Sequence, residues 1–207
     1  PAAGAGTVLA ESPFYLVTDS ATAKRVTDAG GGWLSLADLV TGEGPDPVHL
    51  AVRDPGGSGD GMLGAGAVAE AVWVKSGMDA SAEALATALP RTRTVTDAAP
   101  ALPRAPGEVG LVPEYGLLPV VGQVRAAGSV VLAPRDHTAA LRYSWQPTEA
   151  AAADPARAAA LGRLSAALTG PAADGPMQQA GLRRPGGGPP PGADGLPATS
   201  APLFDVL

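Results

Sequence analysis

One segment constrains the fold of this chain more than any other, because a strand, a glycine-rich loop and a helix follow one another in it without a gap. Residues 48–53 alternate between apolar and polar side chains, which is typical of a strand with one buried face. Residues 54–61 read Asp-Pro-Gly-Gly-Ser-Gly-Asp-Gly and predict a turn. Apolar side chains at helical spacing then run from Met62 to Val74. Strands and helices alternate elsewhere too, so the sequence predicts an α/β fold.

Short apolar runs bounded by glycine, proline or polar residues predict the other strands. Residues 115–124 stay open between helix and strand, because Pro119 disfavours one long helix there. The predicted strands are 14–17, 109–112, 130–133 and 139–145.

The helices are predicted from apolar spacing and from their capping residues. Ser35 is the expected N-cap of a short helix, and Gly77 is expected to interrupt the helix after the glycine-rich loop. The longest predicted helix covers 148–168, begins at Thr148 or at Asp154-Pro155, and carries a stripe of Leu161, Leu164 and Leu168. The other predicted helices cover 20–28, about 79–89 and 172–180.

Glycine and proline are abundant, with 28 and 22 residues, which would ordinarily indicate disorder. However, 45% of the residues are hydrophobic and many fall in periodic runs, so a folded core is expected. The local excess of both residue types lies in 183–207, which is predicted to be a linker or tail. Residues 203–207 are apolar again and are expected to dock or to offer a contact surface.

Composition excludes several classes of function. Without cysteine the chain has no disulfide, no thiolate metal site and no cysteine nucleophile. Its net charge of −6 disfavours non-specific binding to nucleic acid. The two histidines lack metal-ligand spacing, and no apolar run reaches the roughly 18 residues of a membrane span. We therefore expect no metal, no cofactor and no transmembrane segment in this chain, and no signal peptide at its start.

The loop 54–61 is the strongest local candidate for a binding site. A glycine-rich loop at a helix N-terminus exposes backbone N–H groups, and the hydroxyl of Ser58 can join them around an oxyanion. The loop lacks the Gly-Lys-Ser/Thr ending of a P-loop and does not fit a dinucleotide fingerprint. The alternative is a plain strand–helix turn with Ser58 or Asp60 as N-cap.

Two single residues are weaker candidates. Ser12 precedes a buried strand and either donates to a ligand or caps the turn before Pro13. Glu114 follows a strand and either orients a polar group of a ligand or stabilises the first turn of a helix. Asp136 and His137 could join a distant serine in a catalytic triad, but no Gly-x-Ser-x-Gly motif is present, and we expect no catalytic site.

The order of these segments resembles that of type II extracellular solute-binding proteins, also called periplasmic-type binding proteins. The resemblance covers residues 7–183 and depends on the succession of motifs rather than on any single one. It includes an "A-x-S-P-hydrophobic" crossover strand, a "tW-x-dL" helix and a "D-P-x-x-S-x-G" loop. The matching segments are 9–17, 32–39, 48–61, 113–115, 130–145 and 161–183. The actinobacterial subgroup that often places a von Willebrand factor A domain after a proline-rich linker is the most similar.

The resemblance implies two α/β lobes that are joined by crossing strands. On that basis residues 1–182 form the binding-protein-like domain, with a crossover strand near 8–17, a lobe at about 18–112 and a returning segment at about 113–182. The strand–helix unit with which such proteins begin is missing. One lobe is therefore expected to be complete and the other partial, with 183–207 as the tail.

The resemblance also implies an extracellular or cell-surface module, anchored like a lipoprotein through parts outside this chain. It would capture an oxyanion or another small polar solute in the interlobe cleft, for an ABC-transporter permease or for sensing. The implied ligand-binding residues are Ser12, Ser58, Gly59, Asp60, Gly61 and Glu114.

These motifs hold no Lys or Arg, so an anion site in them would depend on N–H and hydroxyl donors. The alternative function is a degenerate binding fold that serves as a protein–protein interaction domain, with 155–168 as a contact surface. An enzyme is the least favoured reading.

Overall fold

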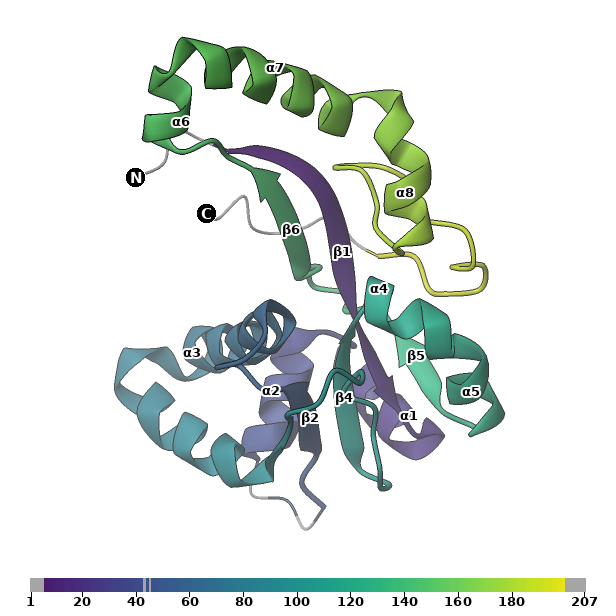
Figure 1. The fold of residues 1–207 in the computed structure, drawn as a ribbon. Helices are drawn as coiled ribbons and strands as arrows, with labels where there is room; N and C mark the ends of the chain where they lie inside the picture. Colours follow the sequence, from purple (N-terminus) through teal and green to yellow (C-terminus); the bar gives the residue numbers. More distant parts are fainter. Residues whose placement is uncertain (1–5, 43, 45, 200–207) are drawn as a thin grey trace. The chain divides into compact units, whose positions relative to one another are not determined.

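The computed structural model describes residues 6–42, 44 and 46–199. It contains two compact units, each built from two separate stretches of chain (Figure 1). Unit 1 comprises 6–12 and 142–194, and unit 2 comprises 13–141 and 195–199. The first strand, β1 (Thr7–Thr18), contributes residues to both units. The predicted crossover strand near 8–17 corresponds to β1, and the apolar residues 203–207 lie outside the described part of the chain.

A mixed sheet forms the centre of unit 2. Its strand order is β3-β2-β4-β1-β5, with β2 parallel to both of its neighbours and β1 antiparallel to both of its own. In the register of the central pair, Leu16 of β1 lies opposite Leu111 of β4. The strands beside β1 are β2 (His49–Arg53), β3 (Thr92–Val95), β4 (Glu108–Pro113) and β5 (Val130–Leu132).

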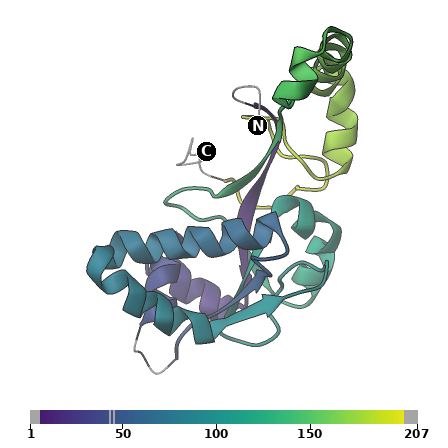
Figure 2. The same cartoon turned by 60° about the vertical axis from the view of Figure 1, so that its left-hand side comes forward.

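The helices of unit 2 begin where the sequence supplies a cap. Asp19 accepts hydrogen bonds from the first turn of α1 (Ser20–Asp28), and Ser58 caps α3 (Gly59–Ala88). A left-handed Gly77, with φ of 71°, divides α3 into two arms, as the sequence predicts. Figure 2 shows α3 beside α2 (Trp33–Thr41), against which it packs.

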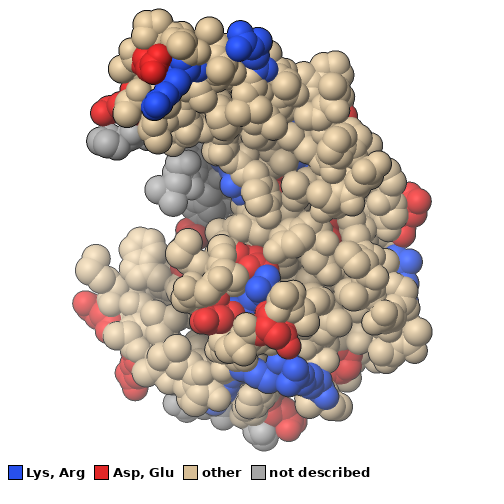
Figure 3. All heavy atoms as spheres, viewed as in Figure 1, with Lys and Arg blue, Asp and Glu red and all other residues tan. Residues whose placement is uncertain are grey.

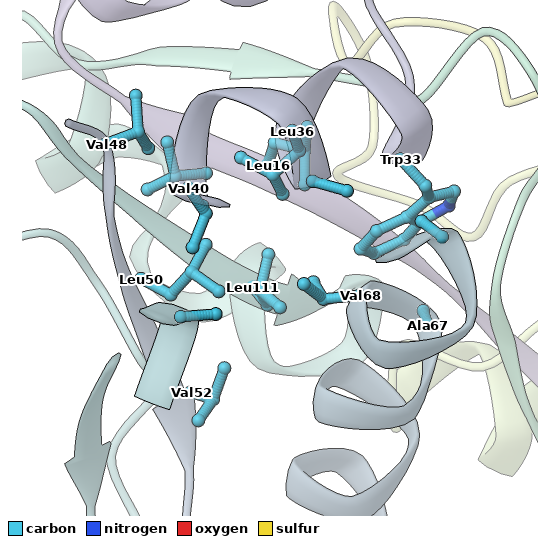
Figure 4. Packing of buried hydrophobic residues seen from close by; sticks show 14 of the residues in the cluster. Leu16, Trp33, Leu36, Val40, Val48, Leu50, Val52, Ala67, Val68 and Leu111 are labelled. Atoms are coloured by element: carbon cyan, nitrogen blue, oxygen red, sulfur yellow. The ribbon is translucent and has the colours of Figure 1, made fainter. Parts of the chain in front are cut away.

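Both faces of the sheet in unit 2 are covered, which explains the unbroken apolar run of β1. Phe14 and Leu16 point into the larger cluster of buried side chains, whereas Tyr15 and Val17 point into a second cluster on the other face. Figure 4 shows the larger cluster, in which Trp33 of α2 lies with side chains from α3 and the strands.

Unit 1 is built differently. The first residues of β1 pair with β6 (Ala140–Trp145), and Glu11 exchanges two backbone hydrogen bonds with Arg183, at 2.8 and 2.9 Å. Three helices complete the unit: α6 (Glu149–Ala153), α7 (Pro155–Thr169) and α8 (Asp174–Gln179). None of their residues is buried.

The guanidinium of Arg184 joins the strand and the helices of unit 1. It donates to the carboxylate of Asp174 at 2.7 Å and to the carbonyls of Leu168, Gly170 and Leu9 at 2.9, 2.7 and 3.4 Å. Residues 183–194, which begin the predicted tail, lie within this unit.

One sequence-based expectation about the helices was wrong, and another was narrowed to one of its two alternatives. Gly32, not Ser35, precedes the first turn of α2, and the Ser35 hydroxyl instead donates to the carbonyl of Ala29. Of the two starts predicted for the helix at 148–168, Asp154-Pro155 begins α7 and Thr148 caps the separate helix α6. The leucine stripe of α7 does not point into a core, since Leu164 is 44% exposed.

Residues 115–124, left open by the sequence, are helical and lie in two short helices, α4 (Glu114–Leu117) and α5 (Val121–Ala126), separated by a 3-10 turn. Within the described residues, no helix combines the length and the apolar character that a membrane crossing requires.

Candidate functional site

The glycine-rich loop is a tightly bonded strand–helix turn. The Ser58 hydroxyl accepts from the backbone N–H of Gly61 at 3.1 Å and donates to the carbonyl of Asp54 at 2.9 Å. The carboxylate of Asp54 accepts from the backbone N–H of Gly56 at 3.0 Å. The structure thus places Ser58 in the capping role that was the alternative to anion binding, and both bonds of its hydroxyl stay inside the loop.

Close packing explains the glycine at position 61. A Cβ atom there would lie 2.3 Å from the carbonyl oxygen of Arg53, whereas at Gly59 it would meet nothing nearer than 3.9 Å. The start of α3 therefore passes directly over the end of β2, which only glycine permits. This approach brings the next side chain of the helix, Asp60, beside the last residue of the strand.

Asp60, Arg53 and Tyr115 form a cluster at the end of the sheet where β2 and β4 finish. The Asp60 side chain is 5% exposed, and its Oδ2 atom lies 3.3 Å from Nη1 of Arg53. The same oxygen accepts from the hydroxyl of Tyr115 at 3.2 Å. Asp60 also occupies the first turn of α3, where the helix dipole favours a negative charge. Figure 3 shows acidic and basic side chains close together on this face of unit 2, over β2 and β4.

A pocket of about 250 Å³ adjoins the cluster. Its polar lining is Arg53, Asp60 and Tyr115, and the remaining lining is apolar or glycine. The latter residues are Ala98, Pro100, Pro113, Gly116, Pro119 and Val120. Concave, mostly apolar pockets with a few convergent polar groups are the usual form of small-molecule sites.

Glu114 and Ser12 are both fully buried. Glu114 is the first residue of α4, and its Oε1 atom accepts from the hydroxyl of Tyr15 at 3.3 Å. Ser12 is the last residue of unit 1 on β1, while the other five candidate residues belong to unit 2. Within unit 2 the structure brings Asp60 close to Tyr115, the direct neighbour of Glu114.

Arg53 and Tyr115 were not among the predicted site residues. Arg53 is the last residue of β2, Tyr115 lies two residues beyond the end of β4, and β2 and β4 are parallel neighbours. Such ends meet at one edge of a sheet, but sequence alone does not tell which strands are neighbours. The guanidinium of Arg53 also means that donors at this edge are not limited to N–H and hydroxyl groups.

The Asp136–His137 pair has a structural role. Both carboxylate oxygens of Asp136 accept backbone N–H groups at the start of α2, from Trp33 and Leu34, each at 3.0 Å. Asp136 is thus a long-range cap of α2. His137 lies beside it, with its ring centroid 6.4 Å from that of Trp33. In the described part of the chain, no group of three or more Asp, Glu or His side chains is arranged to hold a metal ion.

Two carboxylates with perturbed pKa values lie at the opposite edge of the sheet from Asp60. Burial alone would raise the pKa of Asp19, but hydrogen bonds from Thr22, Gly107 and Ala21 outweigh it and lower that pKa to about 2. Burial also acts to raise the pKa of Glu108, and hydrogen bonds from Arg93 and Arg104 lower it below its ordinary value. Both carboxylates stabilise the fold through these bonds and are not part of the candidate site.

The mixed sheet, with one strand antiparallel to its neighbours and shared with a second unit, gives the chain a fold similar to that of the periplasmic binding proteins. A particular structure of this kind is the "Periplasmic thiamin binding protein", which superposes with a TM-score of 0.57 and 15% sequence identity. The superposition covers 96% of this chain and 59% of that protein, so the chain spans less than two thirds of its length. By sequence, no family model matches the chain. No curated protein matches it either.

Proposed function

We propose that this chain is a solute-binding module that captures a small polar ligand outside the cytoplasm. The observation that carries the proposal is the sheet order β3-β2-β4-β1-β5 with its single reversed strand, together with the fold likeness to a periplasmic binding protein. The succession of motifs over residues 7–183 of the sequence supports the same proposal. Capture serves transport through a membrane permease or sensing, and the proposed anchor is a lipoprotein-type N-terminus outside this chain.

The proposed ligand-binding residues are those that the sequence indicated. They are Ser12, Ser58, Gly59, Asp60, Gly61 and Glu114. Asp60 has the strongest support, because it is buried beside a pocket and hydrogen-bonded by two other polar side chains. Ser58 has the weakest, because capping occupies its hydroxyl.

A second candidate function is a protein–protein interaction domain, in which a degenerate binding fold has lost solute capture. It is favoured by α7, a 15-residue helix rich in alanine and leucine with no buried residue. A helix of this kind leaves apolar side chains available to a partner, such as a von Willebrand factor A domain in the same protein. The two proposed functions differ in the ligand, a small solute or a protein, and in the surface: Asp60 belongs to unit 2 and α7 to unit 1.

Isothermal titration calorimetry against a panel of small solutes tests the proposed function. The panel contains phosphate, sulfate, thiamin and small carboxylates, and each is repeated with any longer natural form of the protein. We expect at least one solute to bind, and we expect Asp60→Asn to weaken it while Glu83→Gln, an exposed change on α3, does not. Failure of every solute with both forms would reject solute capture, and binding of a protein partner that Leu164→Glu abolishes would establish the alternative.

A further inference from the structure

Two charged side chains line the pocket. The carboxylate of Asp60 already accepts two hydrogen bonds, whereas, among the residues described, the guanidinium of Arg53 has N–H donors without a partner. Asp60 Oδ2 receives two hydrogen bonds, from Arg53 and from Tyr115. Its charge is therefore balanced within the cluster and by the start of α3. A cationic ligand would have to displace Arg53 to reach this carboxylate, so the cluster is not built to receive an ammonium group.

Arg53 has hydrogen-bonding capacity to spare. A guanidinium carries five N–H donors, and within the described residues Arg53 uses only Nη1, in its bond to Asp60. Its Nε atom is buried and has no hydrogen-bond partner in that part of the chain. Yet the side chain as a whole is 23% exposed, so a ligand in the pocket can reach the guanidinium.

The pocket walls define the rest of the ligand. Three prolines, at 100, 113 and 119, supply rigid apolar surface, and Val120 and Ala98 extend it. At about 250 Å³ the pocket admits a compact molecule rather than a chain or a nucleotide. A multiply charged anion such as phosphate is disfavoured, because Asp60 stands beside the single arginine.

We infer that this pocket binds a small monocarboxylate with a compact apolar body. The fork of Arg53 donates to the ligand carboxylate, the Tyr115 hydroxyl lies within the same polar cluster, and the prolines enclose the apolar body. The inference rests on the proposed function and names the ligand class for it. Every residue that it uses belongs to unit 2.

The test uses the intact protein and three probe pairs of nearly equal size, in which a neutral amide replaces the carboxylate: acetate with acetamide, isobutyrate with isobutyramide, and benzoate with benzamide. Binding is followed by amide chemical shifts in about 0.15 M salt, where the net charge of −6 is largely screened. We expect at least one carboxylate to bind at least about tenfold more tightly than its amide. The shifts should concentrate at Arg53, Tyr115 and Gly116.

Variants assign the effect to Arg53. Arg53→Gln should weaken carboxylate binding by at least about tenfold, whereas Arg157→Gln, an exposed arginine of α7, should leave it unchanged. If Arg53→Gln fails to fold because Asp60 loses its partner, Arg53→Lys and Tyr115→Phe take its place. The lysine retains the charge without the fork, and each change should weaken binding severalfold.

The outcomes separate this inference from the proposed function. Equal affinity for carboxylates and amides, no binding of any probe, or binding that Arg53 variants leave intact would overturn the carboxylate pocket. Capture of another solute in the calorimetric panel would then still support solute binding. Conversely, carboxylate binding at the pocket that Arg53→Gln and Arg53→Lys both weaken would establish the site even if no other solute of the panel bound.

Discussion

The two units of this protein are stabilised by different interactions. Unit 2 has three clusters of buried apolar side chains, whereas among the described residues of unit 1 the buried apolar side chains are those of Ala10, Pro190 and Ala193. Unit 1 instead has polar links, such as Arg184 and the Glu11–Arg183 backbone pair. Each hydrogen bond adds only about 1 kcal/mol net, so unit 1 should open locally at a lower free energy than unit 2.

The test of this difference with the largest expected effect replaces a leucine by alanine in each unit. Leu16→Ala empties a fully buried position on β1 and should lower the free energy of unfolding by about 2–5 kcal/mol. Leu164→Ala changes a residue of α7 that is 44% exposed and should cost less than about 0.5 kcal/mol. Urea denaturation measures both values. Similar losses of unfolding free energy in the two variants would contradict the exposed position of Leu164 on α7.

A second test concerns the polar links of unit 1. Arg184→Gln removes the charged donors to Asp174 and to three carbonyls and should lower the local opening free energy of unit 1 by about 1–2 kcal/mol. Hydrogen exchange followed by mass spectrometry should show faster exchange in α7 and α8 and unchanged exchange in α3. Arg163→Gln, which changes an exposed residue of α7, is the control. Faster exchange throughout the chain would mean that the two units do not open separately.

A third test concerns the close approach at the start of α3. Gly61→Ala places a Cβ atom 2.3 Å from the Arg53 carbonyl oxygen and should destabilise unit 2 by about 1–3 kcal/mol. Gly66→Ala, a helical position with open space around it, should stabilise the protein by about 0.5–1 kcal/mol. Thermal denaturation should therefore give shifts of opposite sign. A neutral Gly61→Ala would mean that the loop is looser than a capped turn.

The smallest expected effect is a pH dependence in unit 2. The pKa of Asp19 is about 2 in the folded protein and 3.8 in its unperturbed state, so its stabilisation is complete above pH 3.8 and is lost as the pH falls toward 2. Asp19→Asn keeps the cap but removes the charge, and should cost at most about 1 kcal/mol at pH 7.

Urea denaturation at pH 7, 4 and 2 measures this dependence. The difference between the wild type and Asp19→Asn should shrink toward zero at the lowest pH. A constant difference at all three values would refute the lowered pKa. The matched change in unit 1 is Asp154→Asn at the cap of α7, which should alter global stability less at pH 7.

The sequence predicts which faces are buried better in unit 2 than in unit 1, although it predicted no strand at β3. Buried strands and capped helices impose a hydrophobic period, so β2, α1 and the break at Gly77 were predicted correctly. In α7 the leucines form a stripe at helical spacing, but none of them is buried. Periodicity identifies a helix, whereas the burial of one face depends on what packs against it.

The sequence predicted the loop of the candidate site but not the side chains that the fold brings to it. Loop chemistry identified residues 54–61 and the capping alternative for Ser58, both of which depend on local contacts. The pairing of Asp60 with Tyr115 joins residues 55 positions apart and requires the strand order, which local patterns do not contain. The sequence placed Arg53 in a predicted strand. Its role depends on the close approach of α3 to the end of β2, which Gly61 allows.

The interrupted chain path of the two units also sets an order for their formation during synthesis. Residues 13–141 are continuous, so nearly all of unit 2 leaves the ribosome as one stretch and can fold at once. Residues 6–12 are made before the rest of both units, yet their partner Arg183 appears 172 positions after Glu11. Until Arg183 is made, one edge of residues 6–12 has no partner strand. That edge can pair with a wrong strand in the nascent chain.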